Sequence, residues 1–372
     1  MVEWNILGNL CEIGTGSNNR EDACDNGLYP FFVRSKEVLR IDSYLYDEEA
    51  VLIPGEGGVG DIFHYINGKY GLHQRTYRVH PISTKVSGRY LFYYLSGNFK
   101  SYINSKSYKA TAASIRKPML IDFPIALPVV EEQNRIVGIL DTFTASIDNL
   151  KEQIAQRRKQ YEYYRDQLLD LEGKEGVEMK SCGEVCEVTD YVANGSFATL
   201  RENVSYRQEP DYAVLVRTID LSNNFDGDKV YIDDKAYKFL SKSSLFGGEI
   251  IINNIGAGVG QTFRCPYLKE KMSLGPNSIL VRTPNNDFYY YWFNSIYGQN
   301  AMMKVVTPGA MPKFNKTGFK TITIPLPSLS DQQRIVSILD TFEASIQNLE
   351  AQLSQREKQY EYYRNKLLTL EK

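Results

Sequence analysis

Two segments of the chain combine basic, amide and hydroxyl side chains, and each comes shortly before a proline-bounded stretch. Lys and Arg neutralise phosphate groups, while Ser, Thr and Asn can hydrogen-bond to phosphate oxygens and to base edges. Both segments therefore predict contact with a nucleic acid, and the alternative for each is an ordinary solvated loop. The candidate side chains are Lys106, Lys109, Thr111, Arg116 and Lys117 in the first segment, and Lys313, Asn315 and Lys316 in the second.

Several arginines and one glutamine elsewhere are weaker candidates for the same role. A guanidinium can bind two acceptors of guanine, and a glutamine amide can pair with adenine, so each could read a base edge. Each could equally be a structural or solvated side chain. These candidates are Arg20, Arg75, Arg201, Arg217, Gln261 and Arg264.

Two glycine-rich loops, Gly55–Gly60 and Gly256–Gly260, raise the question of nucleotide binding. A P-loop needs a Lys followed by Ser or Thr after the last glycine, and neither loop has that pair. We interpret both loops as tight turns between strands, where glycine supplies backbone freedom. A turn that also approaches a DNA backbone is the second interpretation.

The sequence carries no catalytic signature. The carboxylates Asp211, Asp233 and Asp234 beside Lys235 resemble a nuclease pattern only loosely, and the first half of the chain has no equivalent. There is no Ser-His-Asp or Cys-His constellation with a supporting signature, no amino-methyltransferase tetrapeptide and no helicase motif. Cys182 and Cys186 are too few ligands for a zinc site. We therefore predict a non-catalytic chain that holds no cofactor.

The element that must position these side chains is a repeated stretch. Residues 135–172 and 334–371 are offset by 199 positions, and 27 of their 38 positions are identical. Their apolar residues are spaced alternately by three and four, which predicts coiled-coil helices that pack against each other. Arg157 and Arg356 interrupt the two seams. The seam residues are Ile136, Leu140, Phe143, Ile147, Leu150, Ile154, Tyr161, Tyr164, Leu168 and Leu171, and Ile335, Leu339, Phe342, Ile346, Leu349, Leu353, Tyr360, Tyr363, Leu367 and Leu370.

Each repeated stretch also contains the motif Gln-Tyr-Glu-Tyr-Tyr-Arg. Tyr163 and Tyr362 lie off the seam, and exposed aromatic side chains are enriched at protein interfaces. We predict a binding site for a partner protein at these tyrosines and at Arg165 and Arg364, which end the two motifs. The alternative is that the helices only associate with each other.

The predicted organisation is α+β with four segments. Two β-rich bodies cover residues 1–130 and 179–329, and the repeated helices cover 131–178 and 330–372. In the first body we expect strands at 29–33, 50–53 and 76–79 and a helix at 89–105. Ser330 and Gln333 predict a capping box at the start of the second helix.

Bulk properties agree with two bodies on a helical frame. The net charge is +1 for 1–130, −4 for 131–178, +2 for 179–329 and −1 for 330–372, so any DNA contact should lie on the bodies. The mean hydropathy of −0.37 and the lack of a long apolar run predict no membrane segment. Five cysteines without disulfide spacing indicate a reducing compartment, and we expect the cytoplasm.

The alternation of variable body and shared helix resembles the specificity subunit of a type I restriction–modification system over the whole chain. Residues 325–336 have the pattern Pro-Leu-Pro-x-x-x-x-Gln-Gln-Arg-Ile-Val that is characteristic of that family. Residues 309–313, Gly-Ala-Met-Pro-Lys, are similar to a segment that precedes this pattern in many members. The first body departs from the family at 112–117.

The resemblance implies two target-recognition domains that each read one half of a bipartite, asymmetric DNA sequence. It also implies an antiparallel coiled coil, two docked modification (methyltransferase) subunits and restriction (translocase–nuclease) subunits. S-adenosylmethionine, ATP and Mg²⁺ would belong to those partners. The alternative from another class is a coiled-coil adaptor that binds no DNA, and an enzyme ranks third.

Duplex geometry independently favours antiparallel helices. Such helices would relate the bodies by a pseudo-twofold axis, as the two strands of a duplex are related. The 35-residue seam would span about 50 Å as a helix, enough for two half-sites about one DNA turn apart.

Overall fold

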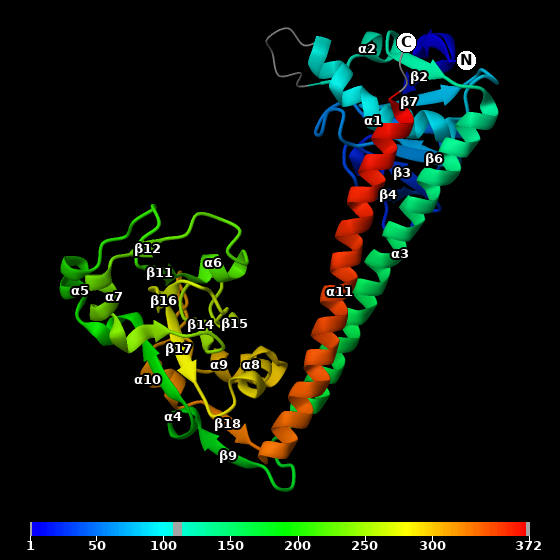
Figure 1. The fold of residues 1–372 in the computed structure, drawn as a ribbon. Helices are drawn as coiled ribbons and strands as arrows, with labels where there is room; N and C mark the ends of the chain where they lie inside the picture. The colour runs from blue at the N-terminus through cyan, green and yellow to red at the C-terminus, as the bar shows by residue number, and fades with distance from the viewer. Residues whose placement is uncertain (1, 107–113, 370–372) are drawn as a thin grey trace. The chain divides into compact units, whose positions relative to one another are not determined.

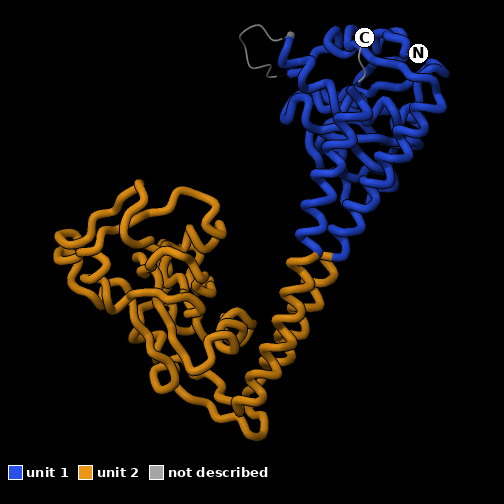
Figure 2. The backbone as a smooth tube through the Cα atoms, viewed as in Figure 1, with its two compact units in different colours: residues 1–153, 349–372 blue, residues 154–348 orange. Residues whose placement is uncertain are grey.

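The computed structural model describes residues 2–106 and 114–369 of the chain. Figure 1 shows the order of the elements. Two compact units are present, one made of residues 1–153 with 349–372 and the other of residues 154–348 (Figure 2). Both boundaries fall inside two long helices, so each unit contains one body and part of each helix.

The body of the first unit is built on a six-stranded sheet with the strand order β2-β7-β5-β6-β3-β4. Successive side chains of β5 point to opposite faces, and both faces are buried. Val51 and Ile53 contribute to the main core, while Ala50 and Leu52 pack with Phe32 on the other face. The strands are β2 (Cys11–Thr15), β3 (Tyr29–Phe32), β4 (Val38–Ile41), β5 (Tyr46–Pro54), β6 (His64–Leu72) and β7 (Thr76–Pro81).

Two helices and a small second sheet complete this body. Helix α1 (Gly88–Lys106) buries aromatic residues against the sheet, and α2 (Lys117–Ile121) follows after the undescribed residues 107–113. Strand β1 (Glu3–Ile6) pairs antiparallel with β8 (Pro124–Leu127), and the 3-10 helices are η1 (Leu7–Asn9) and η2 (Arg20–Asp22). The predicted strands at 29–33, 50–53 and 76–79 and the helix at 89–105 are confirmed.

The body of the second unit contains two four-stranded sheets, ordered β10-β17-β14-β15 and β12-β11-β16-β13. Ile250 and Ile252 of β14 face the core around α8, while Ile251 faces the second sheet. The strands are β10 (Glu187–Asp190), β11 (Ala213–Val216), β12 (Tyr231–Ile232), β13 (Ser244–Leu245), β14 (Ile250–Asn253), β15 (Thr262–Arg264), β16 (Lys271–Leu274) and β17 (Ser278–Arg282).

Strand β18 (Thr323–Leu326) pairs with β9 (Glu178–Ser181), as β8 pairs with β1 in the first unit. Short helices surround the sheets. They are α4 (Cys182–Val185), α5 (Phe197–Asn203), α6 (Thr218–Ser222), α7 (Asp234–Phe239), α8 (Asn286–Asn294), α9 (Ile296–Met303) and α10 (Lys316–Lys320), with the 3-10 helices η3 (Tyr191–Asn194) and η4 (Ser241–Ser243).

The long helices α3 (Val130–Leu169) and α11 (Leu329–Leu368) run antiparallel (Figure 1). In the first unit Phe143 stacks on Tyr363 with ring centroids 5.3 Å apart. In the second unit Phe342 stacks on Tyr164 at 5.5 Å. The beginning of each helix therefore meets the end of the other, which confirms the predicted antiparallel pair and the α+β fold class.

The arginines that interrupt the seams have a physical explanation. The guanidinium of Arg157 lies 5.9 Å from the ring centre of Phe342, and that of Arg356 lies 5.6 Å from the ring centre of Phe143. A guanidinium can cover an aromatic face while its nitrogens stay in water. Each Arg thus closes the seam above the aromatic residue of the opposite helix.

The sequence predicted the helix ends less accurately than their pairing. Helix α3 ends at Leu169, so Leu171 of the predicted seam lies beyond the helix, partly buried against the core of the second body, while Leu370 lies outside the described residues. Leu169 and Leu368, which were not predicted as seam residues, are buried in the body cores. The predicted cap of the second helix was wrong. The cap of α11 is Ser328, whose hydroxyl accepts the N–H of Asp331 at 3.1 Å. The Ser330–Gln333 pattern therefore lies inside the helix, two residues beyond the true cap.

Candidate nucleic-acid interface

In each body, a short segment rests on the glycine-rich loop through the same backbone hydrogen bond. The N–H of Ile115 donates to the carbonyl of Gly55 at 2.8 Å, and the N–H of Phe314 donates to that of Asn254 at 3.1 Å. Both donors are buried, and both pairs are offset by the 199 positions of the helix repeat. The two bodies therefore share a local framework although their sequences differ here.

Because of this shared framework, predicted polar residues of the first body occupy the same positions as predicted polar residues of the second body. Arg116 is the N-cap of α2 and Lys117 its first residue, while Asn315 is the N-cap of α10 and Lys316 its first residue. Arg116 and Lys117 are exposed, as are Lys313 and Asn315. The Asn315 amide oxygen accepts the N–H of Gly318 at 2.8 Å, and the amide nitrogen of this exposed side chain can donate to a ligand.

Of the other candidates of these segments, one already binds a carboxylate and three lie at or beyond the edge of the described residues. Lys316 is half-buried, and its ammonium lies 3.0 Å from Asp190. Lys106 is the last residue of α1, and its side chain is not described. Lys109 and Thr111 lie outside the described residues.

A cavity of about 350 Å³ in the second body opens beside Lys313 and Asn315. Phe197, 71% exposed, lies at its rim, and the amide nitrogen of Asn254 donates to the Phe314 carbonyl at 3.1 Å. The Asn254 amide oxygen is buried and accepts no hydrogen bond from any described residue. An exposed ring, two amides and a lysine can together contact bases and a phosphate backbone.

In the first body, Arg20 is exposed and Arg75 is bound to an acidic partner. The Nη1 atom of Arg75 lies 2.9 Å from the Glu56 carboxylate, and Arg34 binds the same carboxylate at 3.1 Å. Hydrogen bonds from Arg75 and then from Arg34 lower the pKa of the Glu56 carboxyl. Arg34 was not among the predicted residues, because no local pattern reveals its contact with Glu56, 22 positions away.

The remaining candidates of the second body differ in whether their side chains are exposed or already bound to a carboxylate. Arg201 is exposed on α5, and Gln261 is exposed directly after the glycine-rich loop. Arg217 is held by Asp220, whose carboxylate accepts from its Nε at 2.9 Å, and this hydrogen bond raises the pKa of Arg217. Arg217 thus has a local structural role at the start of α6.

Arg264 lies against the long helix and α8 rather than beside the other candidates. Its guanidinium is 4.4 Å from the ring centre of Tyr290 and 3.2 Å from Asp287, and Glu343 of α11 lies 4.0 Å away. In the first body the guanidinium of Arg89 takes this place, 2.7 Å from Asp141 of α3 and above Tyr65. The repeat thus keeps an arginine at the junction of body and helix but supplies it from different strands and helices.

Tyr163 and Tyr362 are 59% and 60% exposed on α3 and α11, as the off-seam position predicts. Arg165 is largely covered and binds Asp166 at 2.9 Å, and Arg364 lies over the ring of Tyr360 at 5.7 Å. Of the four predicted side chains, Tyr163 and Tyr362 are therefore the more exposed. Whether these four side chains bind a partner protein stays a prediction.

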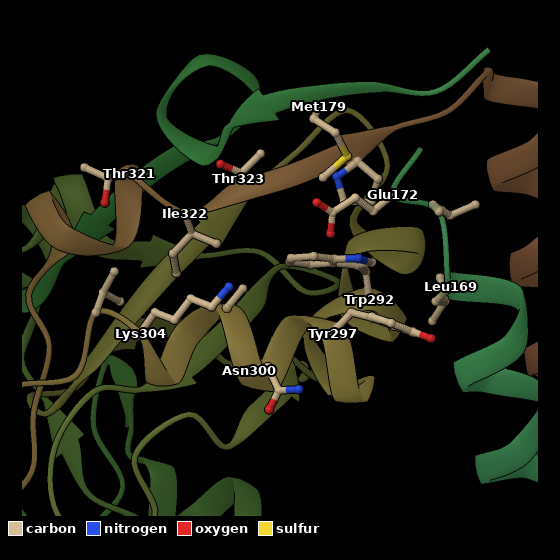
Figure 3. A pocket seen from close by; sticks show the side chains of 14 residues that line it. Leu169, Glu172, Met179, Trp292, Tyr297, Asn300, Lys304, Thr321, Ile322 and Thr323 are labelled. Atoms are coloured by element: carbon tan, nitrogen blue, oxygen red, sulfur yellow. The ribbon is translucent and has the colours of Figure 1, made fainter. Parts of the chain in front are cut away.

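A second cavity of the second unit, about 480 Å³, lies among α9, β18, β9 and the end of α3 (Figure 3). Trp292, Met179 and Lys304 are among its lining residues. In the first unit Phe123 stands at the position of Ile322, and it packs against Phe99 at 5.3 Å and Tyr102 at 5.1 Å. Ile322, which lines this cavity, is thus smaller than the aromatic residue at the equivalent position of the first unit.

Two further findings concern the described residues as a whole. No helix in residues 2–106 and 114–369 has both the length and the apolar character that crossing a membrane requires. Within the same residues, no three metal-ligating side chains gather in a group that could hold an ion.

Comparison with known proteins places this geometry in a family. The model of the type I restriction modification DNA specificity domain matches residues 1–157 and 174–357. The EcoDI type I restriction enzyme specificity subunit of Escherichia coli is 36% identical over 165 residues, which cover 43% of this chain and 36% of that subunit. A putative type I restriction enzyme specificity subunit of Haemophilus influenzae is 25% identical over 396 residues, covering 99% of this chain and 95% of that one.

Solved structures agree in fold. The S subunit of a type I restriction-modification system from M. genitalium superimposes with a TM-score of 0.63 at 15% identity, covering 100% of this chain and 97% of that chain. Since the family model matches most of the chain in two copies, the protein belongs to the type I restriction–modification DNA specificity family.

Proposed function

We propose that each body reads one half of a bipartite, asymmetric DNA sequence and that the paired helices carry the partner subunits. In this assignment residues 1–130 and 179–329 are the target-recognition domains, and residues 131–178 and 330–372 are the connecting helices. The observation that carries the proposal is the pair of equivalent loops, which offers Arg116 and Lys117 in one body and Lys313 and Asn315 in the other.

Within each body, the lysines and Arg116 would fix the register on phosphates, while amide side chains would reach base edges. Lys106, Lys109 and Thr111 would extend the contact of the first body. Arg20, Arg75, Arg201 and Gln261 would add contacts at the neighbouring loops. Arg217 and Arg264 would act mainly by holding the loops and the body in place, because their guanidinium groups already bind carboxylates.

The partners follow from the family. Two methyltransferase subunits would dock on α3 and α11 near Tyr163 and Tyr362, and restriction subunits would join that complex. The chain is a specificity subunit and not itself an enzyme, so S-adenosylmethionine, ATP and Mg²⁺ would be bound by those subunits. The family assignment argues against the alternative of an adaptor without DNA binding.

Duplex binding at several salt concentrations tests the proposal. The full chain, alone and co-purified with its methyltransferase, is titrated with a labelled duplex between 50 and 300 mM salt. Each phosphate contact adds about 0.9 to the slope of log affinity against log salt concentration. The double variant Arg116→Ala, Lys313→Ala should lower the slope by about 1–2. An adaptor would show neither binding nor a slope.

A further inference from the structure

The turn of the first body at Gly57 gathers three arginines. Arg20 and Arg34 line a cavity of about 220 Å³ together with Ser35, Gly57 and His73. Arg75 reaches the same turn through Glu56, the residue before Gly57. Gly57 and Gly58 have φ angles of +73° and +122°, a backbone conformation that favours glycine and brings the turn close to the arginines.

Glu56 occupies the centre of this arrangement. Nη1 of Arg75 donates to both carboxylate oxygens, at 2.9 and 3.2 Å, and Nη1 of Arg34 donates to one of them at 3.1 Å. A carboxylate and a phosphate both offer adjacent anionic oxygens to guanidinium groups. Glu56 therefore holds these arginines in the way in which a backbone phosphate would hold them.

The ion pairs of Glu56 with Arg34 and Arg75 lie at the surface, so another anion can replace the carboxylate without disturbing the core. The side chains of Glu56, Arg34 and Arg75 are 37%, 44% and 57% exposed, so water and an incoming anion reach all three. Exposed ion pairs of this kind are weak and are screened by salt. The backbone of Arg75 stays fixed, because its N–H donates to Nδ1 of the buried His73 at 3.0 Å.

His73 does not compete as a cation. Burial lowers the pKa of His73, and the neighbouring Arg34 and Arg75 lower it further. The site therefore offers arginine charges at neutral pH, with the Glu56 carboxylate opposing them.

We propose that Arg34, Arg75 and Arg20 form a binding site for a DNA backbone phosphate, and that Glu56 is an internal competitor that occupies it in the free protein. This inference rests on the proposed function, since it assumes that the first body meets DNA. DNA binding replaces the carboxylate with a phosphate, and Glu56 turns out to solvent. The competitor weakens binding to any duplex by the same factor, so non-cognate DNA, which offers few other contacts, stays unbound at concentrations at which the target is still bound.

The test measures the affinity of the full chain for a non-cognate 30-base-pair duplex by fluorescence anisotropy at 50–300 mM salt. Glu56→Gln should bind at least about threefold more tightly than the natural chain. Arg34→Gln with Arg75→Gln should bind more weakly and lower the salt slope by about 1–2. Glu131→Gln, which removes an exposed charge from the first turn of α3 in the same unit, is the matched control.

The outcomes separate the inference from the proposed function. If Glu56→Gln binds no more tightly than Glu131→Gln, or if the double arginine variant binds like the natural chain, the competitor model is wrong while duplex recognition stands. If the natural chain shows no salt-dependent binding, the proposed function fails and the inference with it. Thermal melting by circular dichroism verifies that every variant is folded.

Discussion

At the junction of body and long helix, the two units share one side-chain contact and differ in another. The hydroxyl of Tyr93 donates to Asp141 at 2.5 Å, and that of Tyr291 donates to Asp340 at 2.6 Å, so this contact occurs in both copies. Thr144 of α3, however, corresponds to Glu343 of α11. A carboxylate therefore faces a partly buried site in the second unit where the first unit has a hydroxyl.

Replacing Glu343 by Gln should stabilise the protein at neutral pH. Burial raises the pKa of Glu343 above the ordinary carboxyl value of 4.5, so the folded state binds this proton more tightly than the unfolded chain. The stability contribution of Glu343 therefore falls as the pH rises from 4.5 through the folded pKa, and the full cost applies above it. Gln cannot ionise, and its amide oxygen can still accept from Tyr161.

The measurement is the melting temperature of both proteins at pH 4.5 and pH 7.5. We expect a higher melting temperature for Glu343→Gln at pH 7.5 and a much smaller difference at pH 4.5. Glu361→Gln, at an exposed position of the same helix, controls for the change in net charge. An equal effect of the two substitutions at both pH values would contradict the prediction.

Two buried glutamines at the helix starts should differ in importance. The amide of Gln133 donates to the carbonyls of Lys85 and Pro128 at 2.7 and 2.9 Å and accepts from the N–H of Ser87 at 3.1 Å. The amide of Gln332 donates to the Pro327 carbonyl at 3.0 Å. Gln133→Leu removes the side-chain partner of three backbone groups, of which the Pro128 carbonyl belongs to a buried residue, and should cost about 2–4 kcal/mol of unfolding free energy.

Gln332→Leu is the matched variant and should cost about 1–2 kcal/mol, since one bond is lost. Urea unfolding followed by circular dichroism compares the two proteins. Equal losses would show that the number of hydrogen bonds is not what distinguishes the two sites.

The two long helices act as a frame because each end of one meets the opposite end of the other. Their seam is closed by aromatic stacking and by the guanidinium groups of Arg157 and Arg356, which leaves Tyr163 and Tyr362 exposed. Gln167 donates to the Tyr163 hydroxyl at 2.7 Å along α3, so that ring is oriented at the surface. A partner helix or loop can therefore bind without opening the seam.

Replacing Tyr163 and Tyr362 by Ala should weaken assembly with the methyltransferase and leave the fold intact. Both rings are more than half exposed, so their loss removes contact area for a partner but little from the core. The measurement is co-purification of the methyltransferase with the tagged double variant. Tyr267→Ala, at a ring of the second body that is 80% exposed, is the control, and unchanged co-purification of the double variant would refute the docking site.

The chain combines two target-recognition bodies with two repeated helices. Each body should therefore determine its own half of the DNA target. Each body has its own sheets and cores, and the equivalent hydrogen bonds of Gly55 and Asn254 lie within single bodies.

Exchanging residues 179–329 for an unrelated body should therefore change one half of the DNA target and leave the other half as it was. The reciprocal exchange of residues 1–130 should change only the opposite half. Methylation-aware sequencing of host DNA reads both outcomes. A change in both halves after a single exchange would contradict modular recognition.

Local periodicity explains why the sequence could predict the frame. The repeat at an offset of 199 and the heptad spacing are visible in neighbouring residues, and they indicated two helices that need each other as partners. The strands around 29–33, 50–53 and 76–79 followed from the same kind of local pattern. The helix ends were less accurate, because Leu169 and Leu368 are placed by the body cores rather than by the heptad.

The arrangement of the candidate residues depends on contacts between segments that are far apart in the chain. Arg116 and Asn315 became equivalent only through hydrogen bonds from Ile115 to Gly55 and from Phe314 to Asn254, each spanning about 60 residues. The sharing of Glu56 by two arginines and the contact of Arg264 with Glu343 of α11 arise in the same way. Such contacts are selected by the packing of a whole body, which no spacing within a short stretch encodes.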